Sequence, residues 1–109
     1  MTYFIRTDQK VGSCYHEFYK GTWDGRSFWN GDSILLHDDV MAGGFAEAIR
    51  EVIPAYAPCG VTEISVSQWR EIGRRVLRKD VPSQAQYKEA DDWLAGVFQE
   101  HPCFTILGI

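Results

Sequence analysis

The chain has 109 residues, 45% of them hydrophobic, and a formal net charge of −4 at pH 7. This length supports one hydrophobic core, so we expect a single domain over residues 1–109. No apolar stretch approaches the ~20 residues of a membrane span, and the opening MTYFIRTDQK lacks the basic and apolar segments of a signal peptide, so we expect a cytoplasmic protein without a membrane partner.

Strand-forming residues dominate the first third of the chain. The segments TYFIRT (2–7) and CYHEFYKGTW (14–23) are rich in β-branched and aromatic residues, which fit a pleated sheet. The dipeptides Asp24–Gly25 and Asn30–Gly31 tolerate the positive φ angles of tight hairpin turns. We therefore expect a three-strand meander made of residues 14–23, 26–29 and 32–37.

A first helix is expected between Asp38 and Pro54. Apolar residues recur there on one helical face, namely Val40, Met41, Phe45, Ala48, Ile49 and Val52. Gly43 and Gly44 each weaken a helix by up to ~1 kcal/mol relative to alanine, so we expect its first turns to be irregular. Residues 56–65 then predict a loop that leads into a short extended stretch.

Two further helices and a strand follow. The second helix, SVSQWREIGRRVLRK (65–79), directs four apolar side chains inward: Trp69, Ile72, Val76 and Leu77. The third opens at Ser83, with Gln86 at the reciprocal capping position, and ends before Pro102. The segment CFTILGI (103–109) predicts a strand paired within the sheet, because a loose apolar strand is costly. The expected fold class is therefore α+β, a mainly antiparallel sheet of N-terminal strand, meander and C-terminal strand, packed by about three helices.

The charges indicate the class of partner, and the cysteines indicate the redox environment. The net charge is −4 over residues 21–49 and −4 over residues 80–109, against +3 over residues 50–79. An acidic chain of this kind repels free nucleic acid and attracts a basic macromolecule. Three cysteines without a Cys-x-x-Cys pair argue against a disulfide framework and indicate reduced thiols, as in the cytoplasm.

His37, Asp38 and Asp39 form a polar cluster directly after an apolar run. Aspartate at a helix start accepts hydrogen bonds from the free amides of the first turn and interacts favourably with the helix dipole, so a cap explains both carboxylates. A metal site or an acid–base pair needs further ligands from elsewhere, and no second motif supplies them. We therefore expect a helix cap whose charge can also face a partner.

Two pairs of residues, Cys14-x-His16 and His101-x-Cys103, could form a Cys₂His₂ zinc site or a Cys–His nucleophile pair if their strands were neighbours. However, a one-residue spacing is unusual for metal ligands, and Pro102 lies inside the second pair. We therefore expect buried cysteines and ordinary histidines, with no metal, no other cofactor and no catalytic residues. A small zinc-dependent or cysteine hydrolase is the enzymatic alternative.

Arginines gather on the second helix and suggest an RNA-binding module as another alternative; they are Arg70, Arg74, Arg75 and Arg78. Because Glu71 lies within reach of Arg74 and Arg75, a solvated helix face is the simpler interpretation. Most of the four tryptophans are core candidates. Trp29 lies beside a predicted turn and acidic residues, so it is the candidate anchor for an interface.

The run WDGRSFWNGDSILLHDDV, followed by a helix and then by YAPCGVTEISVSQWREI, resembles small immunity proteins of bacterial polymorphic toxin systems, including those of contact-dependent growth inhibition. The resemblance covers roughly residues 20–72 and lies in the order of these segments. It implies a cytoplasmic, non-enzymatic inhibitor that binds a cognate toxin domain, often a nuclease, and covers its active site or substrate surface.

Carboxylates at turns, strand ends and a helix start suit such a role. Nuclease toxins need cationic surfaces for their substrate, and an inhibitor that presents carboxylates in place of phosphates gains steering and specificity. The predicted partner-binding residues are Asp24, Trp29, Asp32, Asp38, Asp39 and Glu63. An alternative acidic face lies on the third helix and consists of Glu89, Asp91 and Asp92.

Overall fold

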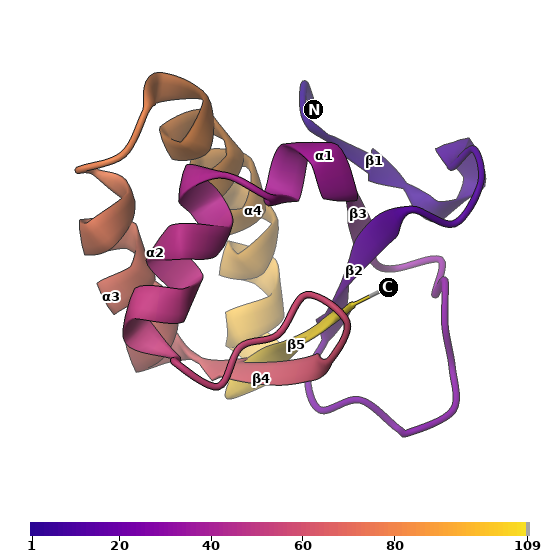
Figure 1. Ribbon diagram of the computed structural model, residues 1–109. Coiled ribbons are helices and arrows are strands. Elements are labelled where there is room, and N and C mark those ends of the chain that lie inside the picture. Colours follow the sequence, from indigo (N-terminus) through magenta and orange to yellow (C-terminus); the bar gives the residue numbers. More distant parts are fainter. Residues whose placement is uncertain (109) are drawn as a thin grey trace.

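A computed structural model describes residues 1–108 and contains one five-stranded sheet beside four α-helices (Figure 1). The strands are β1 (Phe4–Arg6), β2 (Tyr15–Lys20), β3 (Ile34–His37), β4 (Val61–Ser65) and β5 (Cys103–Leu107). Their spatial order is β1-β3-β2-β5-β4, and every neighbouring pair is antiparallel. The predicted α+β class with a mainly antiparallel sheet is confirmed.

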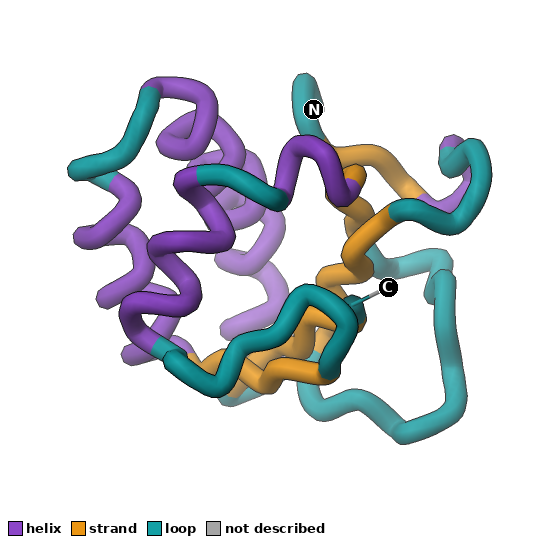
Figure 2. Tube along the Cα trace, viewed as in Figure 1, coloured by secondary structure: helices purple, strands orange, loops and turns teal. Residues whose placement is uncertain are grey.

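The helices are α1 (Asp38–Met41), α2 (Gly44–Val52), α3 (Val66–Val76) and α4 (Val81–Glu100), and a short 3₁₀ helix, η1 (Thr7–Gln9), follows β1. Helices α2, α3 and α4 lie together on one side of the sheet, and a long loop between β2 and β3 extends away from them (Figures 1 and 2). Among residues 1–108 no helix has the length and apolarity needed to cross a membrane.

The hydrophobic core lies between the helices and one face of the sheet. Phe18 at the centre of β2 is paired across the sheet with Ile34 and Ile106, and all three side chains are buried. The centroid of the Phe18 ring lies 5.1 to 6.2 Å from those of three other rings, Phe4, Phe104 and Phe45. Each such side chain contributes roughly 1.5–3 kcal/mol through burial, so this cluster fixes the helices on the sheet.

The predicted C-terminal strand is confirmed over Cys103–Leu107 as β5, which occupies an interior position between β2 and β4. Ile109 of the predicted range lies outside the described residues. All five of its residues are buried. An interior strand covered on both faces reads as a continuous apolar run without alternation. This explains why CFTILGI shows no polar side.

The predicted meander is wrong in its middle strand. Residues 26–29 form no strand; β2 pairs directly with β3, and residues 21–33 form one long loop. Gly25 does have the positive φ angle expected of Asp24–Gly25, at 82°. However, the Asp24 carboxylate accepts hydrogen bonds from the backbone N–H groups of Arg26 and Ser27, so it closes a local turn that starts no strand.

The irregular start of the first predicted helix is confirmed, because the segment divides into α1 and α2 around Ala42 and Gly43. Gly44 at the start of α2 lies directly against the start of α4. A Cβ atom on Gly44 would lie 2.6 Å from the Ser83 hydroxyl oxygen. Glycine therefore weakens the helix locally but permits the close approach of α2 to α4.

Helix α3 begins as predicted. Ser65 accepts a hydrogen bond from the Gln68 backbone N–H, and the Gln68 side chain accepts one from the Ser65 N–H, which makes a complete capping box. Three of the four side chains predicted to face inward are buried. The fourth, Leu77, is 72% exposed because the helix ends at Val76.

Helix α4 begins at Val81, two residues before the predicted start at Ser83. Asp80 is its cap: the carboxylate accepts hydrogen bonds from the Ser83 hydroxyl (2.8 Å) and the Ser83 backbone N–H (3.3 Å). The hydroxyl bond is the main reason why the Asp80 pKa lies below its usual value. The predicted capping role of Gln86 is wrong, because this side chain is buried in the second turn of the helix.

Candidate functional site

A buried carboxylate holds the 21–33 loop against the sheet. Glu17 of β2 is 1% exposed and points away from the helices, because alternate residues of a strand face opposite sides and Phe18 faces the core. It accepts hydrogen bonds from the backbone N–H groups of Trp29 (2.6 Å) and Asn30 (3.0 Å) and from the Ser33 hydroxyl (2.6 Å). Hydrogen bonds to a charged group are about twice as strong as neutral ones, so they hold the loop in one conformation.

The outer part of the 21–33 loop is closed by Asp24. Its carboxylate accepts a 2.6 Å hydrogen bond from the Ser27 hydroxyl, and this bond, followed by the backbone N–H groups of Ser27 and Arg26, lowers the Asp24 pKa. The indole N–H of Trp23 donates to the Ser27 carbonyl at 2.6 Å. The tip of the loop is therefore tied to itself by side-chain hydrogen bonds.

The same loop displays aromatic side chains at the surface. The rings of Trp23 and Phe28 lie 5.1 Å apart, and Phe28 is 55% exposed. Trp29 has a φ angle of 60°, a left-handed conformation that bulky residues rarely adopt and that costs on the order of 1–3 kcal/mol. The Lys10 ammonium lies 4.7 Å from the Trp29 ring centroid. Such a residue persists only because its surroundings, here Glu17, hold its backbone in place.

Four of the six predicted partner-binding residues lie on the loop side of the sheet. Asp24, Trp29 and Asp32 all belong to the 21–33 loop, and the two aspartates are exposed. Glu63 is exposed on β4. Its cross-strand partner Thr105 donates a hydrogen bond to the first carbonyl of the loop, which places Glu63 on the same face.

The other two predicted residues lie at the opposite end of β3, and their capping role is wrong. His37 is the cap of α1, and its Nδ1 accepts a 3.1 Å hydrogen bond from the Asp39 backbone N–H. The backbone of His37 is extended, so both aspartates fall in the first helical turn, where the helix dipole favours their charge. Asp38 accepts a 2.7 Å hydrogen bond from Nε2 of His16, and the Asp39 side chain is 90% exposed.

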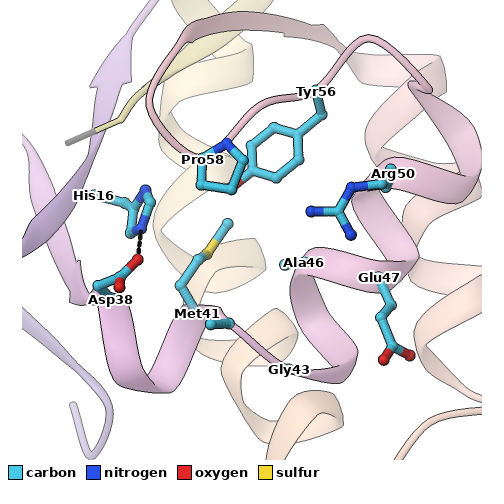
Figure 3. A pocket seen from close by; sticks show the side chains of 10 residues that line it. His16, Asp38, Met41, Gly43, Ala46, Glu47, Arg50, Tyr56 and Pro58 are labelled. Atoms are coloured by element: carbon cyan, nitrogen blue, oxygen red, sulfur yellow. Dashed lines mark hydrogen bonds and ion pairs between the residues drawn. The ribbon is translucent and has the colours of Figure 1, made fainter.

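Beside Asp38 lies a cavity of about 340 Å³, bounded by α1, α2 and the segment before β4 (Figure 3). His16 and Asp38 lie on one side of it, Arg50 lies on the other, and Tyr56 lies between them. Met41 contributes apolar surface, so the cavity combines an imidazole, a phenol and a guanidinium with an apolar wall. We call it the His16 pocket.

Two buried polar atoms at the His16 pocket have no hydrogen-bond partner among residues 1–108. They are Nδ1 of His16 and the hydroxyl oxygen of Tyr56, and these two residues are 1% and 5% exposed. Burial raises the pKa of Tyr56 to about 12, so the phenol keeps its proton at neutral pH. The Arg50 guanidinium carbon lies 5.8 Å from the Tyr56 ring centroid and opposes that shift.

The structure separates the four residues considered for a zinc site. Strands β2 and β5 are neighbours, but their antiparallel register pairs Lys20 with Phe104. Cys103 therefore lies at one end of β2 and Cys14 at the other. Cys103 is buried as predicted, whereas Cys14 and Cys59 are exposed, because both lie in surface loops. Within residues 1–108 no three His, Cys, Asp or Glu side chains are grouped closely enough to hold a metal ion.

Two of the three arginines of α3 are engaged by neighbouring carboxylates. Glu71 accepts hydrogen bonds from Arg74 at 2.6 Å and from Arg75 at 3.2 Å, and these two bonds lower its pKa. The Arg75 guanidinium also lies 3.7 Å from Glu51. This arrangement agrees with the interpretation of a solvated helix face.

The alternative acidic face on α4 is largely used inside the protein. Glu89 accepts hydrogen bonds from the backbone N–H groups of residues 2–4, and so fastens the start of β1 to the helix. Asp91 accepts a 2.9 Å hydrogen bond from the Trp69 indole. Asp91 is nevertheless exposed, as is Asp92, which lies 3.3 Å from the Lys88 ammonium. The loop side of the sheet is therefore the better candidate for a partner.

The sequence prediction missed the roles of Glu17, Arg50 and Tyr56. A weak signal existed for His16, because it is two residues before the core residue Phe18 and so faces the same side of the strand. No local pattern shows that a later loop covers Glu17. No protein-family model, curated protein or solved structure matches this chain, so its function is inferred from the 21–33 loop and the His16 pocket.

Proposed function

We propose that this chain is an immunity protein, a cytoplasmic binding protein of a bacterial polymorphic toxin system that neutralises a cognate toxin domain. The toxin is proposed to be a basic nuclease, and the chain covers its active site or substrate surface without catalysing a reaction. The resemblance over roughly residues 20–72 suggests this role. The observation that supports it best is the 21–33 loop, whose shape is held by the buried Glu17 carboxylate.

A preorganised loop is suited to tight binding. Association costs about 0.5–1.5 kcal/mol for each flexible side chain that must be ordered, and a loop held in one conformation avoids part of this cost. Aromatic side chains are the commonest energetic anchors of interfaces. Phe28 is exposed and Trp29 is partly exposed beside it, so these two rings are the proposed anchors.

The charges of the loop side suit a basic partner. Asp24, Asp32 and Glu63 are all exposed on it. Carboxylates so placed attract a cationic nuclease surface over long range and raise the association rate at low salt. A complex of standard size buries ~1,600 Å² of surface in total, counted over both partners. The 21–33 loop, the neighbouring end of β4 and the surface around them would supply this chain's part of that area.

The test is co-purification with the toxin domain encoded immediately upstream, followed by calorimetric titration of variants. We expect Phe28→Ala and Asp32→Lys each to weaken binding by about tenfold or more, because both change the proposed contact surface. Leu77→Ala and Glu100→Lys are the matched controls, since both residues are exposed on the helical side. Equal effects of loop and control variants would refute the loop as the interface, and failure to bind or protect against the toxin would refute the proposed function.

Asp39 tests whether α1 belongs to the same interface. Its side chain is 90% exposed and only its backbone takes part in the cap, so Asp39→Asn removes one surface charge without placing a cation in the first helical turn. We expect the variant to bind the toxin more weakly with little change in melting temperature. Asp38 is unsuitable for this purpose because it also holds His16.

A further inference from the structure

The two unpartnered polar atoms of the His16 pocket indicate what kind of ligand would supply their missing hydrogen bonds. A polar atom buried without a partner costs about 1–3 kcal/mol, so natural proteins rarely keep two beside one cavity. Here both belong to side chains that are more than nine-tenths buried, and both side chains line the same 340 Å³ space. The toxin interface proposed above is centred on the 21–33 loop, on the other side of the sheet, and uses neither of these two atoms.

The bond to Asp38 fixes the tautomer that a neutral His16 ring adopts. An ionised carboxylate only accepts hydrogen bonds, so the 2.7 Å contact requires the proton of the imidazole to be on Nε2. In the neutral ring Nδ1 then carries a lone pair. The missing partner of His16 is therefore a donor, such as a hydroxyl group.

The missing partner of Tyr56 has the opposite character. Its phenol is protonated at neutral pH, so it has a hydrogen to donate. A hydroxyl group can accept one hydrogen bond and donate another, and so can serve both Tyr56 and His16. One hydroxyl group, or two adjacent ones, would satisfy both buried atoms.

The charge of the pocket favours an anionic group beside that hydroxyl. Of the two carboxylates that line it, Asp38 is engaged by His16, and Glu47 lies 3.4 Å from the Lys79 ammonium and points away from the cavity in Figure 3. The Arg50 guanidinium lies on the far side from His16 and has no carboxylate within ion-pair distance among residues 1–108. Its planar fork matches the oxygens of a carboxylate or a phosphate.

We propose that the His16 pocket binds a small organic anion that carries a hydroxyl group, with the carboxylate or phosphate on Arg50 and the hydroxyl between Tyr56 and His16. The cavity is at the lower end of the ~300–1,000 Å³ range of ligand pockets, so it suits a molecule of few heavy atoms. The side chains of Met41 and Pro58 offer apolar contact for its carbon skeleton.

The test is calorimetric titration of the whole protein with two pairs of probes. Lactate is compared with acetate, and glycerol 3-phosphate is compared with inorganic phosphate. We expect the hydroxyl-bearing member of at least one pair to bind about tenfold more tightly, since it alone satisfies both buried atoms. The pair that binds distinguishes a carboxylate ligand from a phosphate ligand.

Variants place the binding in the pocket. Tyr56→Phe removes only the hydroxyl and is expected to weaken binding about fivefold or more, and Arg50→Gln should weaken it further. Arg26→Gln is the matched control, because this arginine is exposed on the 21–33 loop. His16 is examined in the unsubstituted protein by a two-bond ¹H–¹⁵N NMR spectrum of its ring. The ¹⁵N chemical shift of Nδ1 should be that of an unprotonated nitrogen in the free protein and should change when the tighter probe is added.

Three outcomes would overturn the proposal. They are the absence of binding by all four probes at low millimolar concentration, equal affinities within both pairs, and binding that survives Tyr56→Phe and Arg50→Gln. Each would mean that no hydroxyl-bearing anion completes the two buried atoms. None of these results bears on toxin binding, so the two proposals fail separately.

Discussion

Glu17 shows how one side chain can organise a segment that has no regular structure. Burying a carboxylate costs several kcal/mol unless it is well hydrogen-bonded. Glu17 meets that requirement through two backbone N–H groups and one hydroxyl, all from the 21–33 loop. The loop and the carboxylate therefore stabilise each other, and neither is stable in this arrangement alone.

Replacing Glu17 with glutamine should be strongly destabilising. The amide offers one acceptor oxygen, and its NH₂ group faces donors, so we expect the free energy of unfolding to fall by about 2–3 kcal/mol in urea titrations. Glu63→Gln, an exposed change on β4, is the control and should have little effect. A Glu17→Gln variant as stable as the control would show that the loop is held by other contacts.

Two tyrosines should respond oppositely to loss of their hydroxyl groups. Tyr56 has no hydrogen-bond partner among the described residues, so Tyr56→Phe should leave stability unchanged or raise it by up to about 1 kcal/mol. Tyr87 donates a 3.1 Å hydrogen bond to the Trp69 carbonyl, so Tyr87→Phe should lower stability by about 1 kcal/mol. Thermal denaturation of both variants checks this, and a clear loss in Tyr56→Phe would mean that its hydroxyl is already satisfied.

At the scale of elements, two helical glycines appear equivalent in the sequence and differ in the structure. A Cβ atom on Gly73 of α3 would collide with the Tyr87 side chain, whose ring stacks at 4.3 Å on Trp69. A Cβ atom on Gly96 of α4 would meet no atom within 4 Å. Gly73 therefore permits α3 and α4 to pack closely, and Gly96 has no such role.

We expect Gly96→Ala to raise the free energy of unfolding by about 0.5–1 kcal/mol through helix propensity alone. Gly73→Ala gains the same propensity but forces the Tyr87 ring to move, which costs about 1–3 kcal/mol, so the net effect should be destabilising. Chemical denaturation of the pair measures the difference directly. Equal stabilisation by both substitutions would contradict the close packing of α3 on Tyr87.

Periodicity in the sequence predicted the helices and most strands, because apolar spacing reports directly which face of an element is buried. It failed where a single long-range contact decides the structure. Residues 26–29 have strand-like composition, but Glu17 binds the backbone N–H groups of Trp29 and Asn30 at the end of this segment, and no local pattern shows this. The cap of α4 was misplaced by three residues because both Asp80 and Ser83 are good capping residues.

At the scale of the whole molecule, charge patterning predicted that carboxylates would gather at turns and helix starts. In the structure Asp24, Asp32 and Glu63 lie on one face, whereas Asp38 lines the His16 pocket on the other side of the sheet. Sequence spacing does not show this difference. Asp32 and Asp38 lie on either side of β3, only six residues apart, and still face different surroundings. The pocket itself arises from segments around residues 16, 38, 50 and 56, which only the fold brings together.

Stability should fall in acid. The pKa values of Asp24, Glu51, Glu71 and Asp80 lie below their usual values of 3.8 for aspartate and 4.5 for glutamate. The unfolded chain therefore binds protons more readily than the folded one, so this stabilisation is complete above those values and is lost as pH falls through the lowered ones. Urea midpoints should be similar at about pH 7 and 5 and lower at about pH 3. Equal midpoints at all three would contradict these shifts.

The position of β5 has a consequence for synthesis. Because β5 separates β2 from β4, the sheet cannot close while the ribosome still covers residues 103–107. Strands β2 and β4 must wait for β5, and a fragment lacking β5 would keep an open slot between their two edges. A short peptide with the sequence of β5 fits such a slot, so the protein is a natural candidate for division into two complementing fragments.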